Sequence, residues 1–203
     1  MTKRLKPAER RASIIAVAKV LFADSGYHGV SVDEIAKRLG VSPAVLYQHF
    51  DSKEQLYIAV LDEIAGQRES YIEAALSGPD DFGSVLLRMA HVYSDSIERD
   101  PDYLKMEMHS VLEGAKSTQL LFESRWKSFS DYIEVSMVEL ASEGIVNQTN
   151  PYSASLMFQG LMRELLYAKC IYFSEKYKDI PLKTLVNQQV HLFLNAVEYK
   201  HPD

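Results

Sequence analysis

One segment of the sequence, residues 31–53, combines the residue types that two short helices need in order to cross over a tight turn. It reads SVDEIAKRLGVSPAVLYQHFDSK. Ala36 is small enough for two helices to approach closely, and Gly40 can adopt a positive φ in the turn. The spacing from Ala36 to Gly40 is that of a helix-turn-helix, whose second helix presents its N-terminal residues to the major groove. The chemistry that this segment indicates is recognition of duplex DNA.

The outward side of the second helix carries more hydroxyl and small side chains than base-reading ones. Gln48 is the one residue there that suits bidentate contact with a base, which would be adenine. Ser42 and Tyr47 carry hydroxyls that suit phosphate, and His49 and Lys53 lie where the helix leaves the groove. We therefore expect recognition by backbone contacts and DNA shape more than by many base contacts. The predicted DNA-binding residues are Ser31, Ser42, Pro43, Ala44, Tyr47, Gln48, His49 and Lys53.

The same residue types also permit a purely structural interpretation. Ser42 and Pro43 are a favoured cap and first position of any helix. Tyr47 and Phe50 would then be core residues. We favour the core for Phe50, as an anchor to the following helix, and DNA contact for Tyr47.

Helical periodicity runs through the whole chain. Apolar residues at Ile14, Ala18 and Phe22 share one face, and Gly26 suits the left-handed residue that ends a helix. Ser31 stands three residues before Glu34, as in a capping box. No segment shows the alternation of a strand, so we predict an all-α fold. The expected helices span residues 8–24, 31–39, 43–50, 51–76, 82–99, 102–115, 118–143, 151–176 and 181–199.

Composition limits the class of protein. The chain has 203 residues, of which 47 % are hydrophobic and 25 % charged, as is ordinary for a globular protein. Cys170 is the only cysteine, so no intrachain disulfide can form. No apolar run reaches the roughly 18 residues of a membrane span. We expect a cytoplasmic protein that has no membrane partner.

Charge is distributed unevenly along the chain. Residues 1–50 hold eight of the 22 Lys and Arg residues but only four of the 28 Asp and Glu residues, which gives +4. The remainder carries −10. A basic head on an acidic body indicates that a polyanion binds the head alone. A chance excess of surface lysines would give the same numbers.

Residues 16–56 resemble the DNA-binding head of TetR/AcrR-family transcriptional regulators. The pattern LYQHFDSKEQL after a Gly-Val-Ser turn carries much of this resemblance. One departure concerns Pro43 and Ala44, where many members carry lysine or arginine followed by glycine. The residues that match the family pattern are Ala18, Leu21, Phe22, Gly26, Tyr27, Ser31, Val32, Ile35, Ala36, Gly40, Val41, Ser42, Leu46, Tyr47, His49, Phe50, Ser52, Lys53 and Leu56.

The resemblance implies a three-helix, helix-turn-helix domain over residues 1–50. It implies a larger helical effector-binding and dimerisation domain over residues 51–203. Such a protein is a homodimer that binds a palindromic double-stranded operator, most often as a repressor that a small molecule releases. It needs no cofactor and no metal.

Methionine and aromatic residues recur in the expected core, where soft side chains adapt to irregular ligands. Each of them is also an ordinary core residue. We predict a small, largely apolar effector, and an inward-facing Glu107 or Glu113 would favour a cation whereas Arg163 would favour an anion. The predicted lining residues are Met89, Tyr93, Met106, His109, Leu112, Phe122, Trp126, Phe129, Met157 and Met162. Two long apolar helices end the chain, and the predicted dimer contacts there are Leu161, Leu165, Val186, Val190, Phe193 and Val197.

Two other classes of protein remain open from the sequence. A helical module whose head binds an acidic protein would show the same charge pattern. A helical enzyme would need an acid, base or nucleophile in its core, and no local catalytic motif is present. His109 and Glu113 stand four apart on one helix, but two ligands do not fill a zinc site. We therefore predict that the protein is not an enzyme.

Overall fold

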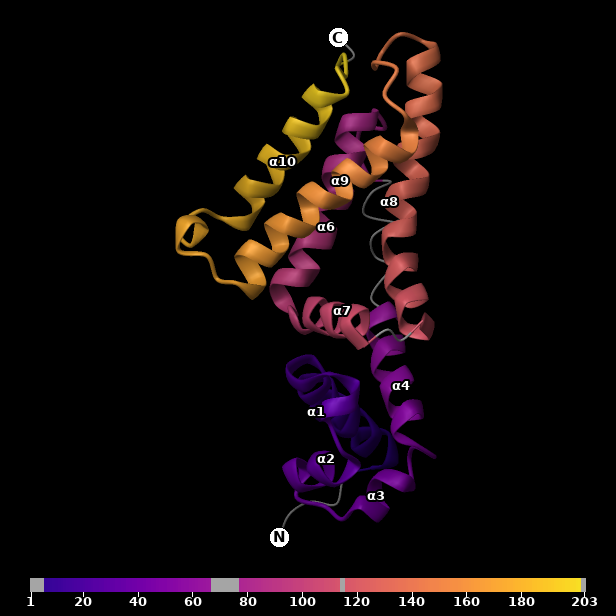
Figure 1. Cartoon of the computed structure of the whole chain (residues 1–203), viewed down its shortest axis with the longest axis vertical. Helices are drawn as coiled ribbons and strands as arrows, with labels where there is room; N and C mark the ends of the chain where they lie inside the picture. Colours follow the sequence, from indigo (N-terminus) through magenta and orange to yellow (C-terminus); the bar gives the residue numbers. More distant parts are fainter. Residues whose placement is uncertain (1–5, 67–76, 114–115, 202–203) are drawn as a thin grey trace. The chain divides into compact units, whose positions relative to one another are not determined.

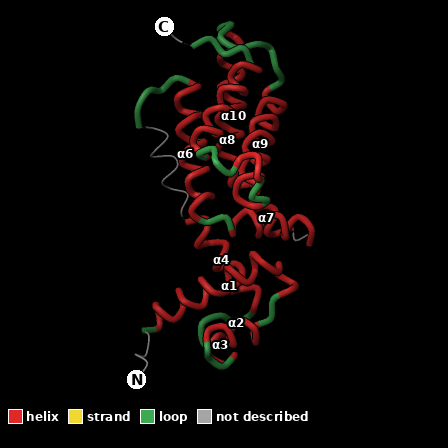
Figure 2. Tube along the Cα trace, turned by 90° about the vertical axis from the view of Figure 1, so that its left-hand side faces the viewer, coloured by secondary structure: helices red, strands yellow, loops and turns green. Residues whose placement is uncertain are grey.

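The computed structural model describes residues 6–66, 77–113 and 116–201, with side chains except those of residues 65–66 and 116–125. Every element in these ranges is helical, which confirms the predicted all-α fold (Figures 1 and 2). A π-helical turn, Tyr167–Ile171, and a short 3-10 turn, Glu175–Tyr177, follow α9. The α-helices are α1 (Pro7–Gly29), α2 (Val32–Leu39), α3 (Pro43–Tyr47), α4 (Lys53–Gly66), α6 (Phe82–Arg99), α7 (Asp102–Glu113), α8 (Lys116–Ser142), α9 (Pro151–Leu166) and α10 (Leu182–Ala196).

The chain divides into two compact units. The first joins residues 1–67 to residues 102–121, and the second joins residues 68–101 to residues 122–203. The expected division after residue 50 differs from this one, because α7 and the start of α8 belong with the N-terminal helices. As a division of function, the boundary after residue 50 stays a prediction.

The first unit has a core that the helical pattern of the sequence anticipates. Ile14 and Phe22 of α1, Ile35 of α2 and Leu46 of α3 are buried with at most 2 % of their surface exposed. The ring of Phe22 packs on that of Tyr57 in α4 in an edge-to-face arrangement, with 4.9 Å between ring centroids. In this core α1 packs against α2, α4 and α7, and α2 packs against α3.

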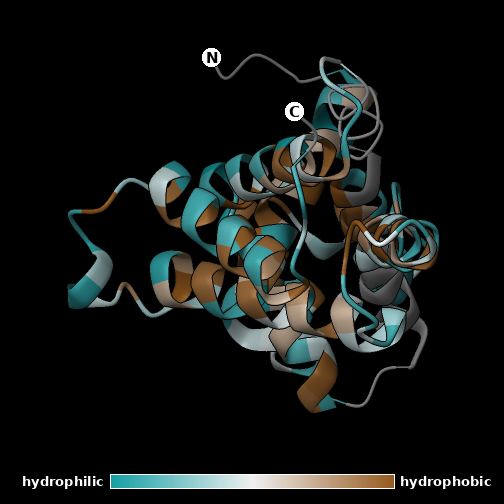
Figure 3. Ribbon diagram, turned by 90° about the horizontal axis from the view of Figure 1, so that it is seen from above, coloured by the Kyte–Doolittle hydropathy of each residue, from teal (hydrophilic) through white to brown (hydrophobic). Residues whose placement is uncertain are grey.

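The second unit is built from α6, α9, α10 and the greater part of α8. Leu86 of α6, Phe158 of α9 and Phe193 of α10 are fully buried, and the last two rings meet at 5.2 Å. Hydrophobic residues lie between neighbouring helices of this unit, as the hydropathy colours show (Figure 3). The connection from the end of α9 to the start of α10 projects from these two helices (Figures 1 and 3).

This projecting connection corrects one predicted helix. A single helix over residues 151–176 was expected, but α9 ends at Leu166 and Phe173 has a positive φ of 47°. Lys169 holds the connection together, because its amine donates to the main-chain oxygens of Tyr177, Lys178 and Ile180 at 2.8–2.9 Å. Contacts between residues 8–11 apart are not part of the helical period, so the helical pattern does not predict them.

Other boundaries shifted by smaller amounts. The predicted break at Gly26 is real, with φ 72° and ψ 174°, but the chain resumes helical geometry and α1 runs to Gly29. The third helix ends at Tyr47 rather than near residue 50. Residues 67–76 of the predicted fourth helix lie outside the described residues. Among the described helices, none is both long and apolar enough to cross a bilayer.

Candidate nucleic-acid interface

The turn between α2 and α3 forms as its residue types predict. The Ser31 hydroxyl accepts the amide N–H of Glu34 at 3.1 Å and so caps α2. Gly40 ends the helix in the left-handed region at φ 68°. The next amide, that of Val41, donates back to the Ala36 oxygen at 3.0 Å, which closes the helix end. A short, rigid connection therefore sets the crossing of the two helices.

The outer face of α3 is free for contact. Leu46 points into the core and is 2 % exposed, whereas Tyr47 on the other side is 54 % exposed. Ala44 is three residues before Tyr47 and four before Gln48, so these three residues share one side of the helix. Ala44 and Gln48 are also exposed. The Ser42 hydroxyl makes no capping hydrogen bond, so it is not committed to the helix start. These four residues form one outward face, which we call the α3 face.

The remaining predicted DNA-binding residues are less available for contact. Ser31 is exposed, but its hydroxyl is occupied by the cap of α2. Pro43 and His49 are half-buried. Phe50 is 6 % exposed, which confirms its predicted place in the core.

Lys53 has a different role from the predicted phosphate clamp. Its amine donates to the main-chain oxygens of Tyr27 at 2.8 Å and Val30 at 3.0 Å. The same amine lies 4.2 Å from the centre of the Tyr27 ring. An ammonium group has three donors, so two of them hold the segment that leads into α2. Lys53 therefore positions the helix-turn-helix, and its contact with phosphate stays a prediction.

His109 and Glu113 both face the end of α1. The Glu113 carboxylate accepts the amide N–H groups of Tyr27 and His28, each at 3.3 Å. A Cβ added to Gly26 would lie 2.9 Å from Nδ1 of His109. Among the described residues, no three His, Cys, Asp or Glu side chains gather as a metal site requires.

Burial and charge both act on the tyrosine that closes this core. Burial, together with the charge of Glu113 and the neighbouring Tyr27, raises the pKa of Tyr57 to about 12. Burial likewise raises the pKa of Tyr27, with further contributions from Glu54 and Glu113. Both phenols are therefore neutral at pH 7.

Three of the predicted effector-lining residues meet in the second unit. The ring of Tyr93 lies 5.0 Å from Trp126 and 5.8 Å from Phe129, and all three are at most 6 % exposed. Phe158 continues this aromatic cluster at 5.5 Å from Phe129. The guanidinium carbon of Arg163 lies 5.5 Å from the Trp126 ring centre.

The indole of Trp126 brings a buried polar atom to the aromatic cluster. Within the described part of the chain, its nitrogen has no hydrogen-bond partner, and neither has Nδ1 of His91 on α6. An unmet buried N–H costs free energy. Such groups therefore commonly indicate a partner that is not part of the protein chain.

The other predicted lining residues differ in where the structure places them. Leu112 is 82 % exposed on α7, so its prediction as a lining residue is wrong. Met106 is fully buried, but it belongs, like His109, to the first unit. The side chain of Phe122 lies outside the described residues. Within the second unit, Met162 is fully buried, and Met89 and Met157 are half-buried.

The predicted dimer residues are largely inside one copy of the chain. Val186, Phe193 and Val197 are fully buried, and Leu165 and Val190 are at most 7 % exposed. Leu161 is half-buried. These side chains pack between α6, α9 and α10, so they are not available to a second copy. The sequence shows a broad apolar face but not which helix covers it.

Exposed apolar residues lie on the opposite sides of the last two helices. Tyr152 and Leu156 of α9 are 71 % and 69 % exposed, and Leu192 of α10 is 53 % exposed. Gly160, one turn beyond Leu156, has open space where a Cβ would stand. We call these four residues, which are exposed on two packed helices, the α9–α10 face; Leu192 also lines a groove between α6 and α10.

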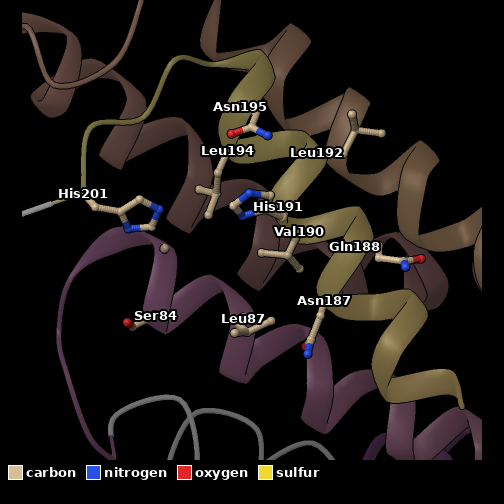
Figure 4. Close-up of a pocket in the computed structure, with 11 residues that line it drawn as sticks. Ser84, Leu87, Asn187, Gln188, Val190, His191, Leu192, Leu194, Asn195 and His201 are labelled. Carbon is tan, nitrogen blue, oxygen red and sulfur yellow. The ribbon is translucent and has the colours of Figure 1, made fainter.

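A groove between α6 and α10 was not anticipated from the sequence. It has a volume of about 610 Å³, with Leu87, Val190 and Leu194 on its apolar side. Asn187, Gln188, His191, Asn195 and His201 line it as well (Figure 4). On α10 these polar residues have the spacing of a solvated helix face, which is why the sequence gives no signal for a groove.

The helix-turn-helix and the helices beside it match a known family model. Residues 14–60, from α1 into α4, match the family model described as "Bacterial regulatory proteins, tetR family". This part of the chain is therefore similar to the DNA-binding domain of TetR-family regulators. The structure of the chain has the all-helical fold of solved TetR-family regulators, with a helix-turn-helix head and a larger helical remainder.

Two curated transcriptional regulators are similar to less than half of the chain. The transcriptional activator FasR of Mycolicibacterium smegmatis is 42 % identical over 97 residues, which are 48 % of this chain and 44 % of FasR. The regulator BetI of Rhizobium meliloti is 35 % identical over 89 residues, 42 % of this chain and 43 % of BetI. The chain thus spans less than half the length of these two relatives.

Solved structures share the fold over almost the whole chain. The fatty acid degradation regulator FadR of Bacillus halodurans has a TM-score of 0.71 at 18 % identity, covering 98 % of this chain and all of FadR. AibR, solved with isovaleryl coenzyme A and operator DNA, has a TM-score of 0.68 at 22 % identity, covering 95 % of this chain and all of AibR. Identities this low establish the fold alone.

Proposed function

We propose that the protein is a ligand-responsive transcriptional regulator. Two copies bind the half-sites of a near-palindromic operator, and each inserts its α3 face into the major groove. The observation that carries this proposal is the exposed row Ser42, Ala44, Tyr47 and Gln48 on a helix whose other side is sealed by Leu46. A regulator of this kind acts on DNA in the cytoplasm.

The second copy is proposed to bind the α9–α10 face. Leu156 and Leu192 expose apolar surface on neighbouring helices, and the open space at Gly160 lets a partner helix approach closely. A two-fold axis would place the same face of both copies in contact. Burial of this surface then supplies the free energy of association.

The effector is proposed to bind against the aromatic cluster of the second unit. Aromatic rings from three helices favour an apolar ligand. The unpartnered N–H of Trp126 favours a ligand that also carries a hydrogen-bond acceptor. We therefore propose an amphipathic molecule with an apolar body and a polar end. AibR with isovaleryl coenzyme A, and a regulator of Saccharomonospora viridis with choline, show that neighbours of this fold bind such different molecules.

The effector works through the two states of the dimer. It releases DNA only as far as it binds the DNA-free arrangement more tightly than the DNA-bound one. We propose repression as the direction of control, although FasR is an activator by name and KstR2 a repressor. The position of the operator relative to the promoter distinguishes these two directions.

The proposed function is tested by selection of genomic DNA fragments on the purified protein, followed by footprinting. We expect two protected half-sites about one helical turn apart, roughly 34 Å. Affinity should fall linearly with the logarithm of salt concentration, with a slope of about −0.9 per neutralised phosphate. Failure to enrich any fragment, together with affinity that does not respond to salt, would favour a protein partner for the basic head.

The chain has a single tryptophan, which makes effector binding directly measurable. A bound effector near Trp126 should change the intrinsic fluorescence and raise the melting temperature. A compound that binds without being converted supports a regulator, whereas turnover of that compound would support the enzyme alternative.

A further inference from the structure

The end of α1 contains a break that exposes main-chain N–H groups. Gly26 leaves helical geometry at φ 72° and ψ 174°, and residues 27–29 begin a new helical turn. A helix start presents N–H groups that lack an acceptor within the helix. The segment from residue 26 to residue 30 leads directly into α2, so its position sets the position of the helix-turn-helix.

A carboxylate from α7 accepts these N–H groups. Oε2 of Glu113 accepts the N–H of Tyr27, and Oε1 accepts the N–H of His28. One ionised side chain thus binds two successive amides, as an anion does at a helix start. Glu113 is 86 residues away from Tyr27 along the chain, so the contact is a tertiary one.

Gly26 is the residue that makes this contact possible. A Cβ at this position would lie 2.3 Å from Oε1 of Glu113, which is far inside van der Waals contact. The positive φ is also strained for any residue with a side chain. Two independent requirements, space and backbone conformation, therefore favour glycine at position 26.

The same segment is held from its other side by Lys53. The Tyr27 residue donates its N–H to Glu113 and accepts the amine of Lys53 at its oxygen. A second bond from Lys53 reaches the oxygen of Val30. A carboxylate from α7 and an amine from α4 thus both hold one short stretch of main chain, and they share Tyr27.

A second ionic contact joins α7 to α1 nearby. The amine of Lys105 lies 2.9 Å from Oδ1 of Asp24 and 3.2 Å from Oδ1 of Asp102. The Lys105 amine is about one-third exposed, and exposed pairs contribute little free energy. Glu113, by contrast, accepts main-chain N–H groups of the segment that leads into the helix-turn-helix.

We infer that Glu113 is a positioning residue for operator binding, which fixes residues 26–30 and hence the helix-turn-helix to α7. The inference rests on the proposed function, because it specifies how the α3 face is held for DNA. Loss of the carboxylate frees the segment on one side and leaves the α3 face itself intact. The affinity for the selected operator should then fall, and the preference for this operator over operators of altered half-site spacing should become smaller.

The test compares full-length wild type with Glu113→Gln, Glu113→Ala and Gly26→Ala. Glu63→Gln, an exposed α4 residue of the same unit, is the matched control for the change in charge. Hydrogen–deuterium exchange is followed for the amides of Tyr27 and His28. DNA affinity is measured on the selected operator and on operators whose half-site spacing is changed by one base pair.

Exchange at both amides should become about tenfold faster in Glu113→Ala, as expected for loss of hydrogen bonds to a charged group. Affinity for the selected operator should fall by about fivefold or more, and the preference over altered spacings should flatten. Glu113→Gln should lie between wild type and Glu113→Ala, because a carboxamide keeps only one acceptor. Gly26→Ala should reproduce the loss, and Glu63→Gln should resemble wild type.

A merely structural role would lower affinity equally for every spacing, and this result would overturn the inference. If Glu113→Ala does not fold, Glu113→Gln decides by the same two measurements. If wild type selects no operator, the proposed function fails. The exchange measurement then stands alone, and unchanged exchange in Glu113→Gln would overturn the link to residues 26–30 as well.

Discussion

The guanidinium carbon of Arg11 lies 5.0 Å from the ring centre of Phe50. This contact joins the start of α1 to the residue that closes the turn after α3. The Phe50 ring itself is 6 % exposed, so it is part of the core of the first unit and not of the surface for DNA. The Phe50 ring therefore holds α3 in place but is not itself available for contact with DNA.

Replacement of Phe50 by alanine should destabilise the protein strongly. Truncation of a buried phenylalanine typically lowers the free energy of unfolding by about 3–5 kcal/mol. Phe173→Ala is the matched control, because this ring is 71 % exposed and its loss should change stability little. Chemical denaturation of both variants measures the difference. Equal, small losses would show that Phe50 is not the anchor described above.

Removal of the Tyr47 hydroxyl should weaken operator binding without loss of stability. The phenol is 54 % exposed on the α3 face, where it suits a phosphate oxygen. Loss of a hydrogen bond to a charged group should lower affinity by about tenfold in Tyr47→Phe. Tyr172→Phe, at 55 % exposure in the second unit, provides the control. Equal affinity for the two variants would remove Tyr47 from the DNA contacts.

A charge on the α9–α10 face should separate the two copies. Leu156→Glu places the new carboxylate twice across a two-fold interface, so the dimer should dissociate at least about tenfold more readily. The fold should persist, because Leu156 is 69 % exposed. Sedimentation velocity compares this variant with Val138→Glu, a residue 61 % exposed on α8. A Leu156→Glu protein that dimerises like wild type would place the interface elsewhere.

Cys170 should be unreactive in the folded protein. Burial, with a further contribution from the charge of Glu98, raises the pKa of its thiol from 9.0 to about 11. At pH 8 the thiolate is then about 100-fold scarcer than in the unfolded chain, and alkylation should slow accordingly. The native state is favoured while the thiol is protonated, so this stabilisation is present below pH 9 and is lost between pH 9 and 11. Equal alkylation rates with and without denaturant would contradict this burial.

Local chemistry made much of the DNA-binding unit predictable. The cap at Ser31, the left-handed Gly40 and the first-turn Pro43 each act within a few residues of chain. Their conformations follow from steric limits and short hydrogen bonds that the sequence specifies directly. The outward direction of Tyr47 then follows from the helical period once Leu46 is placed inside.

Tertiary contacts account for what the sequence did not predict. The Lys53 amine donates to the oxygen of Tyr27, 26 residues away, and no local pattern indicates this contact. Val186 and Phe193 were expected between two copies, whereas α6 and α9 cover them within one copy. Leu112 has the same helical spacing as a core residue but is 82 % exposed. Helical spacing identifies an apolar face and not the element that buries it.

Cross-linking from position 47 tests the central claim most directly. A photo-activated phenylalanine analogue replaces Tyr47 in one protein and Tyr172 in another, and each is irradiated with the selected operator. We predict cross-links from position 47 to nucleotides of both half-sites and none from position 172. Absence of cross-links from position 47 on DNA that the protein demonstrably binds would show that the α3 face does not enter the groove.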